Sequence, residues 1–213
     1  MKSLILLNSL LLGTTISDAD SDYFYIPDSL CHPALIILSC TGATFEDLSS
    51  IRFIADSLGI ILATCHKSRN HRDINLNDRD IMWTVEKLLQ NYKVEPGQVF
   101  IYGFSGMGVQ ALLELFLHPQ TFRGAIAACA HKGAMPFADF SRLHNHSVYL
   151  ISRKKDWNLN DNILMHNLFK GSGIIDTLIV KNGEHSVPSS QELYNAIKWL
   201  LEKISISHGN PDN

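Results

Sequence analysis

The chain has 213 residues, with 18 Lys or Arg against 21 Asp or Glu, and a formal net charge of −3 at pH 7. A chain of this length forms one domain that buries a sizeable core without help from metals or disulfides. The slightly acidic balance and the absence of a long basic run argue against nucleic acid as the main partner. A neutral or small-molecule target is expected, and the oligomeric state is left open.

The first 19 residues resemble a secretory signal peptide. They hold one Lys, a short apolar stretch over residues 4–12, and small residues at Ser17 and Ala19 with the spacing of a cleavage site. Asn8 interrupts the stretch, so a buried first strand is the alternative. The stretch is too short to span a bilayer as a helix. We therefore expect a secreted or periplasmic protein rather than a cytoplasmic one.

Short apolar runs alternate with amphipathic segments along the rest of the chain. The runs are continuous, which is typical of strands covered on both faces, and they span residues 34–39, 60–64, 99–103, 125–130, 148–152 and 175–180. Helical spacing and capping residues predict helices over 44–58, from Asn77 or Asp78 to 89, over 109–116, around 163–168, and over 189–201. This alternation predicts an α/β fold with a mostly parallel central sheet and helices on both faces. One domain is expected over 20–205, followed by a flexible tail over 206–213.

Three chemically active residues follow three of these apolar runs. Ser105 lies in the glycine-rich stretch "YGFSGMGVQAL", between a strand and a helix, which is the context of a strained nucleophile elbow. A serine hydroxyl needs a base to take its proton and a third group to orient that base. Asp156 and His185 follow the next-to-last and the last run, at the sheet edge where such folds bind ligands. Asp161 is the rival acid, although a capping role explains it adequately.

The order Ser, Asp, His is that of the α/β-hydrolase fold. With "KKDWN" around the acid and "GEHSVP" around the base, the sequence resembles the α/β-hydrolase superfamily over about residues 23–203. It is similar to the small lidless esterases of the dienelactone hydrolase and polyhydroxybutyrate depolymerase type. The resemblance implies an α/β-hydrolase fold with no substantial lid, in which "YFYIP" is an early strand and "SCTGAT" is the oxyanion loop.

The resemblance also implies an oxyanion hole and shows two departures from the family pattern. The backbone N–H groups of Gly106 and Ala43 would stabilise the oxyanion. Met107 stands where the family has a small residue, and Thr41 stands where it has histidine, although Gly42 remains. Both departures leave open whether the protein turns over a substrate.

The predicted function is a serine hydrolase that cleaves a carboxylic ester or thioester through an acyl-enzyme, with no cofactor. Few residues separate Ala130 from Val148, where lids are often inserted, so we expect an open, shallow site. Such a site suits short acyl groups or an external polymer. The alternatives are a binding protein that keeps the fold without turnover, and a peptidase that uses the same triad.

Basic residues gather in the loops at the expected site edge. Seven of the eighteen Lys and Arg residues fall in the loops after residues 64, 130 and 152. Arg69, Arg72, His131 and Lys132 are therefore candidates for a rim that favours anionic substrates. The alternative is a solvated loop whose charges are neutralised by the nearby residues Asp73, Asp78 and Asp80.

Cysteine and histidine spacing predicts no metal site. The four cysteines show no C-x-x-C pattern, and no carboxylate or cysteine completes a zinc pattern around the histidines. Cys40, Cys65 and Cys129 each close an apolar run and are expected to be buried as small hydrophobic residues. In an exported protein, Cys40 and Cys65 would be the candidate disulfide pair.

Overall fold

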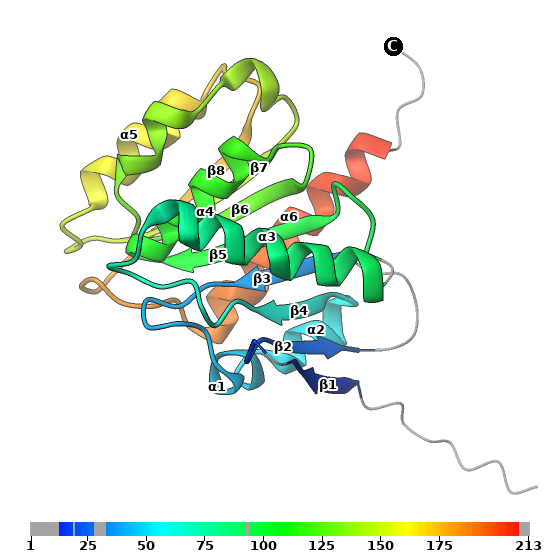
Figure 1. Cartoon of the computed structure of the whole chain (residues 1–213). Coiled ribbons are helices and arrows are strands. Elements are labelled where there is room, and N and C mark those ends of the chain that lie inside the picture. The colour runs from blue at the N-terminus through cyan, green and yellow to red at the C-terminus, as the bar shows by residue number, and fades with distance from the viewer. Residues whose placement is uncertain (1–12, 19, 28–32, 93, 209–213) are drawn as a thin grey trace, which may run out of the picture.

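The computed structural model describes residues 13–18, 20–27, 33–92 and 94–208. A mostly parallel eight-stranded sheet lies at its centre, in the order β1-β2-β4-β3-β5-β6-β7-β8 (Figure 1). The strands are β1 (Thr14–Ser17), β2 (Tyr23–Ile26), β3 (Ala34–Ile37), β4 (Ile61–Thr64), β5 (Val99–Phe104), β6 (Phe122–Ala128), β7 (Ser147–Arg153) and β8 (Ile175–Lys181). Strands β3 to β8 run parallel, and β1 and β2 are antiparallel at one edge. The predicted parallel sheet is confirmed.

Helices cover both faces of the sheet. They are α1 (Phe45–Ser49), α2 (Arg52–Leu58), α3 (Ile74–Asn91), α4 (Gly106–Leu117), α5 (Leu159–Phe169) and α6 (Ser190–His208). Buried residues of α3, α4 and α5 share one core cluster with the sheet, and those of α1, α2 and α6 share the other. Figure 1 shows α3 and α4 in front of the sheet and α6 behind it. Because both faces are covered, the parallel strands consist of the continuous apolar runs seen in the sequence.

Two helix predictions differ from the structure. The helix expected over 44–58 is two helices, because Ile51 leaves helical geometry with φ −121° and ψ 8°. The third helix begins before Asn77, since the Asp73 carboxylate accepts the N–H groups of Asn75 and Leu76 and caps it. The sequence pattern placed this start too late because the first turn has no buried apolar residue before Ile81.

Between β6 and β7 the chain forms two short 3₁₀ helices, η1 (Lys132–Phe137) and η2 (Phe140–Arg142). Helix η1 packs against α4 and α5 at the edge of the core. No substantial lid is present in this segment, as predicted, so the carboxyl edge of the sheet is not covered from this connection.

The described structure covers only part of the two ends of the chain. Residues 1–12 and 19 lie outside the described residues, and export stays a prediction. Within the same segment, Thr14–Ser17 forms β1 and pairs with β2. At the other end α6 continues to His208, and residues 209–213 of the expected tail lie outside the described residues. Over the described part of the chain, no helix combines the length and apolar character needed to cross a bilayer.

The cysteines in the described part of the chain are free thiols and form no disulfide. Cys65 and Cys129 are buried, Cys40 is half-buried, and all three are free thiols. Cys40 and Cys65 do follow neighbouring strands, β3 and β4, as expected. The Cys40 sulfur, however, contacts the carbonyl oxygen of Phe104 at 3.3 Å, so the suspected bridge is not formed. Cys31 lies outside the described residues.

Candidate active site

Ser105 occupies a strained turn between β5 and α4. Its φ of 56° and ψ of −124° lie in a region that residues with a side chain rarely adopt. The Ser105 N–H donates to the carbonyl of Ala128 on β6 at 2.8 Å, and the Ser105 carbonyl accepts the N–H groups of Gly108 and Val109. The turn is therefore held from both sides, with the serine between strand and helix as the elbow motif requires.

Two glycines allow this turn to close. A Cβ on Gly103 would lie 2.0 Å from the carbonyl oxygen of Met107, and a Cβ on Gly106 would lie 2.4 Å from the Asn70 side-chain oxygen. Met107 itself is 1% exposed and its side chain belongs to the core cluster under α4. The close passage involves the Met107 backbone and not its side chain. The bulky residue in the elbow is thus accommodated without moving Ser105.

The three predicted residues meet at the carboxyl edge of the sheet. His185 Nε2 lies 2.9 Å from Ser105 Oγ, and His185 Nδ1 lies 2.9 Å from Asp156 Oδ1. A carboxylate only accepts hydrogen bonds, so Nδ1 carries the proton and Nε2 is free to accept the serine proton. The rival Asp161 lies elsewhere, with its carboxylate 3.2 Å from the Lys132 ammonium and accepting the Lys132 N–H.

Asp156 is buried and held by several donors. Its Oδ1 accepts the N–H of Asn158 at 2.9 Å in addition to His185, and its side chain is fully buried. Burial alone would raise the pKa of Asp156, but the Cys129 thiol, Asn158 and His185 together lower it. A low pKa keeps the carboxylate charged, and a charged carboxylate stabilises the imidazolium that forms during catalysis.

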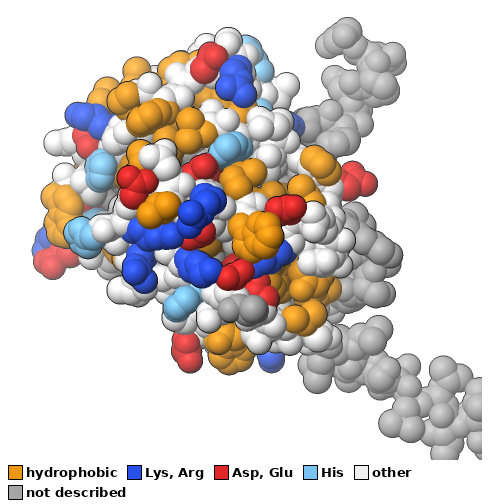
Figure 2. All heavy atoms as spheres, in the orientation of Figure 1, with side chains coloured by type: hydrophobic (Ala, Val, Ile, Leu, Met, Phe, Trp, Pro, Cys, Tyr) orange, Lys and Arg blue, Asp and Glu red, His pale blue; other side chains and the backbone are white. Residues whose placement is uncertain are grey.

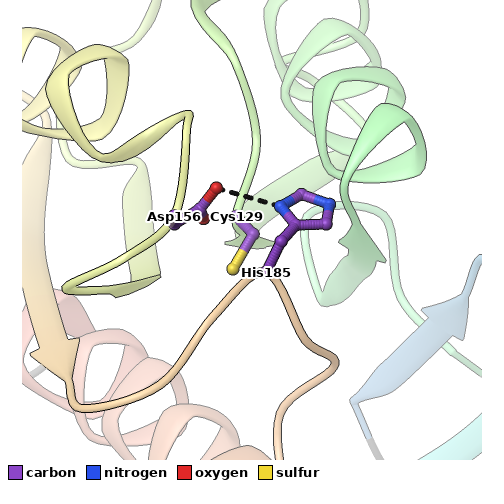
Figure 3. A group of neighbouring side chains, drawn as sticks. All are labelled: Cys129, Asp156 and His185. Carbon is purple, nitrogen blue, oxygen red and sulfur yellow. Dashed lines mark hydrogen bonds and ion pairs between the residues drawn. The ribbon is translucent and has the colours of Figure 1, made fainter.

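Cys129 is a neighbour of the triad that the sequence did not assign to the site. Figure 3 shows its sulfur beside Asp156 and His185, and ligand atoms of the three residues lie within 4.8 Å of one another. Cys129 has a left-handed φ of 51° at the end of β6, and burial and then Asp156 raise the pKa of its thiol to about 12. The only sequence signal was its place directly after an apolar run, at the same sheet edge as Ser105.

Two aromatic rings enclose the His185 imidazole. Trp157 stacks on it with ring centroids 3.9 Å apart and an interplanar angle of 20°, and Phe104 contacts it at 4.8 Å. The Trp157 side chain is nevertheless 74% exposed. Phe104 also lines a cavity of about 310 Å³, together with residues of β3, β5, α1, the start of α6 and Val187. Trp157 thus stacks on one side of the His185 imidazole, and Phe104, which also lines the cavity, contacts it as well.

The loop after β3, which holds Ala43, is fastened by the loop after β4. Gly42 has φ 95°, and a Cβ there would lie 2.3 Å from the His66 carbonyl oxygen. His66 Nδ1 lies 3.1 Å from the Ala43 carbonyl, and the Asn70 N–H donates to the Cys40 carbonyl at 3.0 Å. Thr41 is exposed beside these contacts. These contacts join the two loops, and the roles of Ala43 and Gly106 as oxyanion donors stay predictions.

The candidate rim residues differ in how they are held. The Arg72 guanidinium pairs with Asp80 and also donates to the carbonyls of Lys67 and Leu76, and Lys132 pairs with Asp161. Arg69 is exposed and its side chain has no ion-pair partner among the described residues. Figure 2 shows Lys and Arg side chains gathered in the middle of one face with Asp and Glu among them.

His131 is exposed, and its Nδ1 accepts the Gly133 N–H at 3.1 Å. Among the four rim candidates, Arg72 and Lys132 therefore have structural partners, whereas Arg69 is available to a ligand. Their contribution to substrate binding stays a prediction.

Comparison with known proteins identifies the fold. No protein-family profile matches the sequence, and a search of curated proteins finds no match. A ferulic acid esterase superposes with a TM-score of 0.72 at 15% identity, covering 91% of this chain and 99% of that chain. An S-formylglutathione hydrolase from Staphylococcus aureus gives 0.67 at 14% identity, with 89% and 95% covered. A hyperthermophilic esterase from the archaeon Pyrobaculum calidifontis gives 0.68 at 14%, with 92% and 85% covered.

These likenesses, together with the strand order, show that the chain has the α/β-hydrolase fold without a substantial lid. The predicted fold is confirmed over nearly the whole chain. Because the identities are low, the likeness concerns the fold, and the chemistry has to be argued from the site itself.

Proposed function

We propose that this protein is a serine hydrolase that cleaves a carboxylic ester or thioester through an acyl-enzyme. The observation that carries the proposal is the continuous chain of hydrogen bonds from Ser105 Oγ through His185 to Asp156, with both distances at 2.9 Å. The superposed proteins named as esterases and as an S-formylglutathione hydrolase support the same reaction class.

In the proposed reaction, Ser105 Oγ attacks the carbonyl carbon while its proton passes to His185 Nε2. The carbonyl oxygen becomes an oxyanion that accepts hydrogen bonds from the N–H groups of Gly106 and Ala43. When the tetrahedral intermediate collapses, the bond to the leaving alcohol or thiol breaks and His185 returns the proton to it. Water then attacks the acyl carbon while passing a proton to His185 Nε2, and as the bond to Ser105 Oγ breaks, His185 returns the proton to that oxygen and the acid is released.

A fluorophosphonate probe tests the activated serine. Wild type is expected to be labelled at neutral pH and Ser105→Ala is not, whereas Ser141→Ala, which removes an exposed serine of η2, keeps full labelling. Wild type that stays unlabelled while correctly folded would favour the alternative, a binding protein that retains the fold. Peptide cleavage faster than p-nitrophenyl ester cleavage by wild type would favour the other alternative, a peptidase.

The substrate side of the proposal rests on the surroundings of His185. The cavity of about 310 Å³ lined in part by Phe104 has the size of a small ligand site, and the apolar residues that make up most of its lining suit a short acyl chain. Val187, which is 62% exposed, forms part of its lining. Val187→Phe should lower kcat/KM for butyrate esters at least fivefold more than for acetate esters. Equal losses of kcat/KM for the two esters would show that the acyl chain does not bind in this cavity.

The compartment is a separate part of the proposal. We place the protein outside the cytoplasm because of its signal-like first 19 residues. Sequencing the N-terminus of the chain recovered from the cell envelope or the medium tests this placement. Recovery from the cytoplasm with Met1 intact would contradict it.

A further inference from the structure

A second cluster of ionisable side chains lies between α3 and α4, apart from the triad. Glu114 and His118 are one helical turn apart at the C-terminal end of α4, and Asp78 faces them from α3. Ligand atoms of the three side chains lie within 4.8 Å of one another. His118 Nε2 is 2.6 Å from Asp78 Oδ1 and 3.9 Å from Glu114 Oε2. Two carboxyl groups and one imidazole thus converge on one point.

Glu114 is the unusual member of the cluster because one of its oxygens is unsatisfied. Its side chain is 0% exposed, and Oε1 accepts a hydrogen bond from Gln110 Nε2 at 2.6 Å. Oε2 is buried, faces His118, and has no hydrogen-bond partner among the described residues. A protonated Glu114 would share its proton with the facing Asp78 carboxylate, whereas an ionised Glu114 would leave a buried anionic oxygen without a donor.

Asp78 and Glu114 bring two carboxyl groups to the same point, with ligand atoms of both within 4.8 Å of the His118 imidazole nitrogen. Two carboxyl groups that face each other in a buried place favour either a shared proton or a bound cation. A cation between them would satisfy Glu114 Oε2 and relieve the repulsion from Asp78.

We infer that Asp78, Glu114 and His118 form a binding site for a divalent transition-metal ion of the Zn²⁺ type. One imidazole nitrogen and two carboxylate oxygens are a donor set that Zn²⁺ accepts, and two ligands one turn apart on a helix are a common way to present it. The Asp78 and His118 side chains are 29% and 24% exposed, so the ion can enter from solvent and water can complete its coordination.

Two neighbouring amide side chains, Gln110 and Asn77, form hydrogen bonds that hold the Glu114 carboxylate in place. Gln110 holds the Glu114 carboxylate through Oε1, and the Asn77 amide lies 3.5 Å from the Gln110 side-chain oxygen. Such outer partners fix the orientation of metal ligands. The ion would join α3 to α4, the helix that begins directly after Ser105. The sequence showed no metal pattern because the third ligand comes from a different helix.

The test is Zn²⁺ binding by the untagged chain after treatment with a chelator. Calorimetry should show one equivalent bound, and thermal unfolding should shift to higher temperature. Glu114→Gln and His118→Gln should each weaken this binding at least tenfold. Co²⁺ in place of Zn²⁺ should give visible absorption bands with wild type that are lost with His118→Gln.

Two control variants distinguish this site from the other side-chain groups that could bind Zn²⁺. His166→Gln disrupts the other His–Asp pair outside the triad region, His166 with Asp176 at 2.5 Å, and should leave Zn²⁺ binding unchanged. Cys129→Ala disrupts the Cys129, Asp156 and His185 group and should also leave it unchanged.

Wild type that binds no Zn²⁺, or equal binding by wild type and His118→Gln, would overturn the inference and assign a shared proton to the cluster. Loss of binding only in Cys129→Ala would overturn it in favour of the triad group. His118 lies at the exposed end of α4, so its variant keeps the test valid if Glu114→Gln does not fold. Fluorophosphonate labelling of Ser105 should be unaffected in both ligand variants.

Discussion

A single carboxylate oxygen, Asp156 Oδ1, accepts the hydrogen bond that orients the His185 imidazole. Asp156→Asn keeps the shape but turns an acceptor-only group into an amide that can hold the imidazole in the wrong tautomer. We expect kcat for a p-nitrophenyl ester to fall about 10³- to 10⁴-fold. Asp161→Asn is the matched control, because that carboxylate pairs with Lys132 and should leave kcat within about twofold. A large loss in the control and a small one in Asp156→Asn would reverse the assignment of the acid.

Cys129 is a buried neighbour of the same carboxylate. Asp156 Oδ2 is buried and has no hydrogen-bond partner among the described residues, and the Cys129 thiol, whose sulfur lies 3.7 Å from the Ser186 carbonyl oxygen, is close enough to the carboxylate to lower its pKa. Cys129→Ala should raise the pKa of Asp156 and lower kcat by about fivefold, which corresponds to about 1 kcal/mol. Cys129→Ser restores a donor and should recover most of the activity. Cys65→Ala, which removes a buried thiol at another strand end, should leave kcat unchanged. Carboxyl NMR titration of Asp156 checks the pKa, and an unchanged pKa in Cys129→Ala would exclude this positioning role.

The turn around Ser105 depends on a close backbone contact between Gly103 at the end of β5 and Met107 at the start of α4. Gly103→Ala would place a Cβ 2.0 Å from the Met107 carbonyl, which cannot move without unwinding the start of α4. We expect a loss of more than about 3 kcal/mol in the free energy of unfolding, measured by urea titration. In Gly108→Ala the nearest atoms lie at 3.0 Å, one of them a methyl group, and the better helix propensity of Ala offsets part of the strain. That variant should change stability by less than about 1 kcal/mol, and similar losses in both would show that the strand and helix adjust freely.

At the element scale, the sequence predicted what depends on local pattern and missed what depends on contacts between distant segments. The parallel strands were found because burial on both faces leaves continuous apolar runs, and the proximity of Ser105, Asp156 and His185 was predicted because each follows such a run. The break at Ile51 was missed, since apolar spacing continues through it. Strand β1 was anticipated only as the alternative to a signal peptide, and as a buried strand, whereas its residues are mostly exposed and pair with β2 at the sheet edge. Cys129 and the Glu114 cluster depend on which side chains the tertiary fold brings together.

At the scale of the whole molecule, one buried ion pair joins the last helix to the sheet. Arg153 of β7 makes two hydrogen bonds to Glu192 of α6, at 2.8 and 3.1 Å, and the two side chains are only 5% and 10% exposed. Glu192 also accepts the Ser189 N–H as the third residue of a capping box. The pair therefore links the helix cap to the strand that precedes Asp156.

The pair makes the stability of the whole fold depend on pH. Burial alone would raise the pKa of Glu192, but Ser189 and Arg153 lower it below its usual 4.5. Because the folded pKa is the lower one, the stabilisation is fully present above about pH 4.5 and is lost as the pH falls through the folded pKa. Glu192→Gln keeps the capping box and removes only the charge, so it should cost about 3 kcal/mol in the free energy of unfolding at pH 7.

The difference between wild type and Glu192→Gln should then shrink as unfolding is repeated at lower pH, because wild type also loses the charge there. Lys181→Gln is the control: its ammonium lies 3.7 Å from Glu192 but is 50% exposed, so it should have little effect on stability at any pH. A constant difference from pH 7 down to pH 3 would show that Glu192 stabilises α6 through its shape and hydrogen bonds. The acid sensitivity of the fold would then have to come from other carboxylates, of which Asp156, with its lowered pKa, is the first to examine.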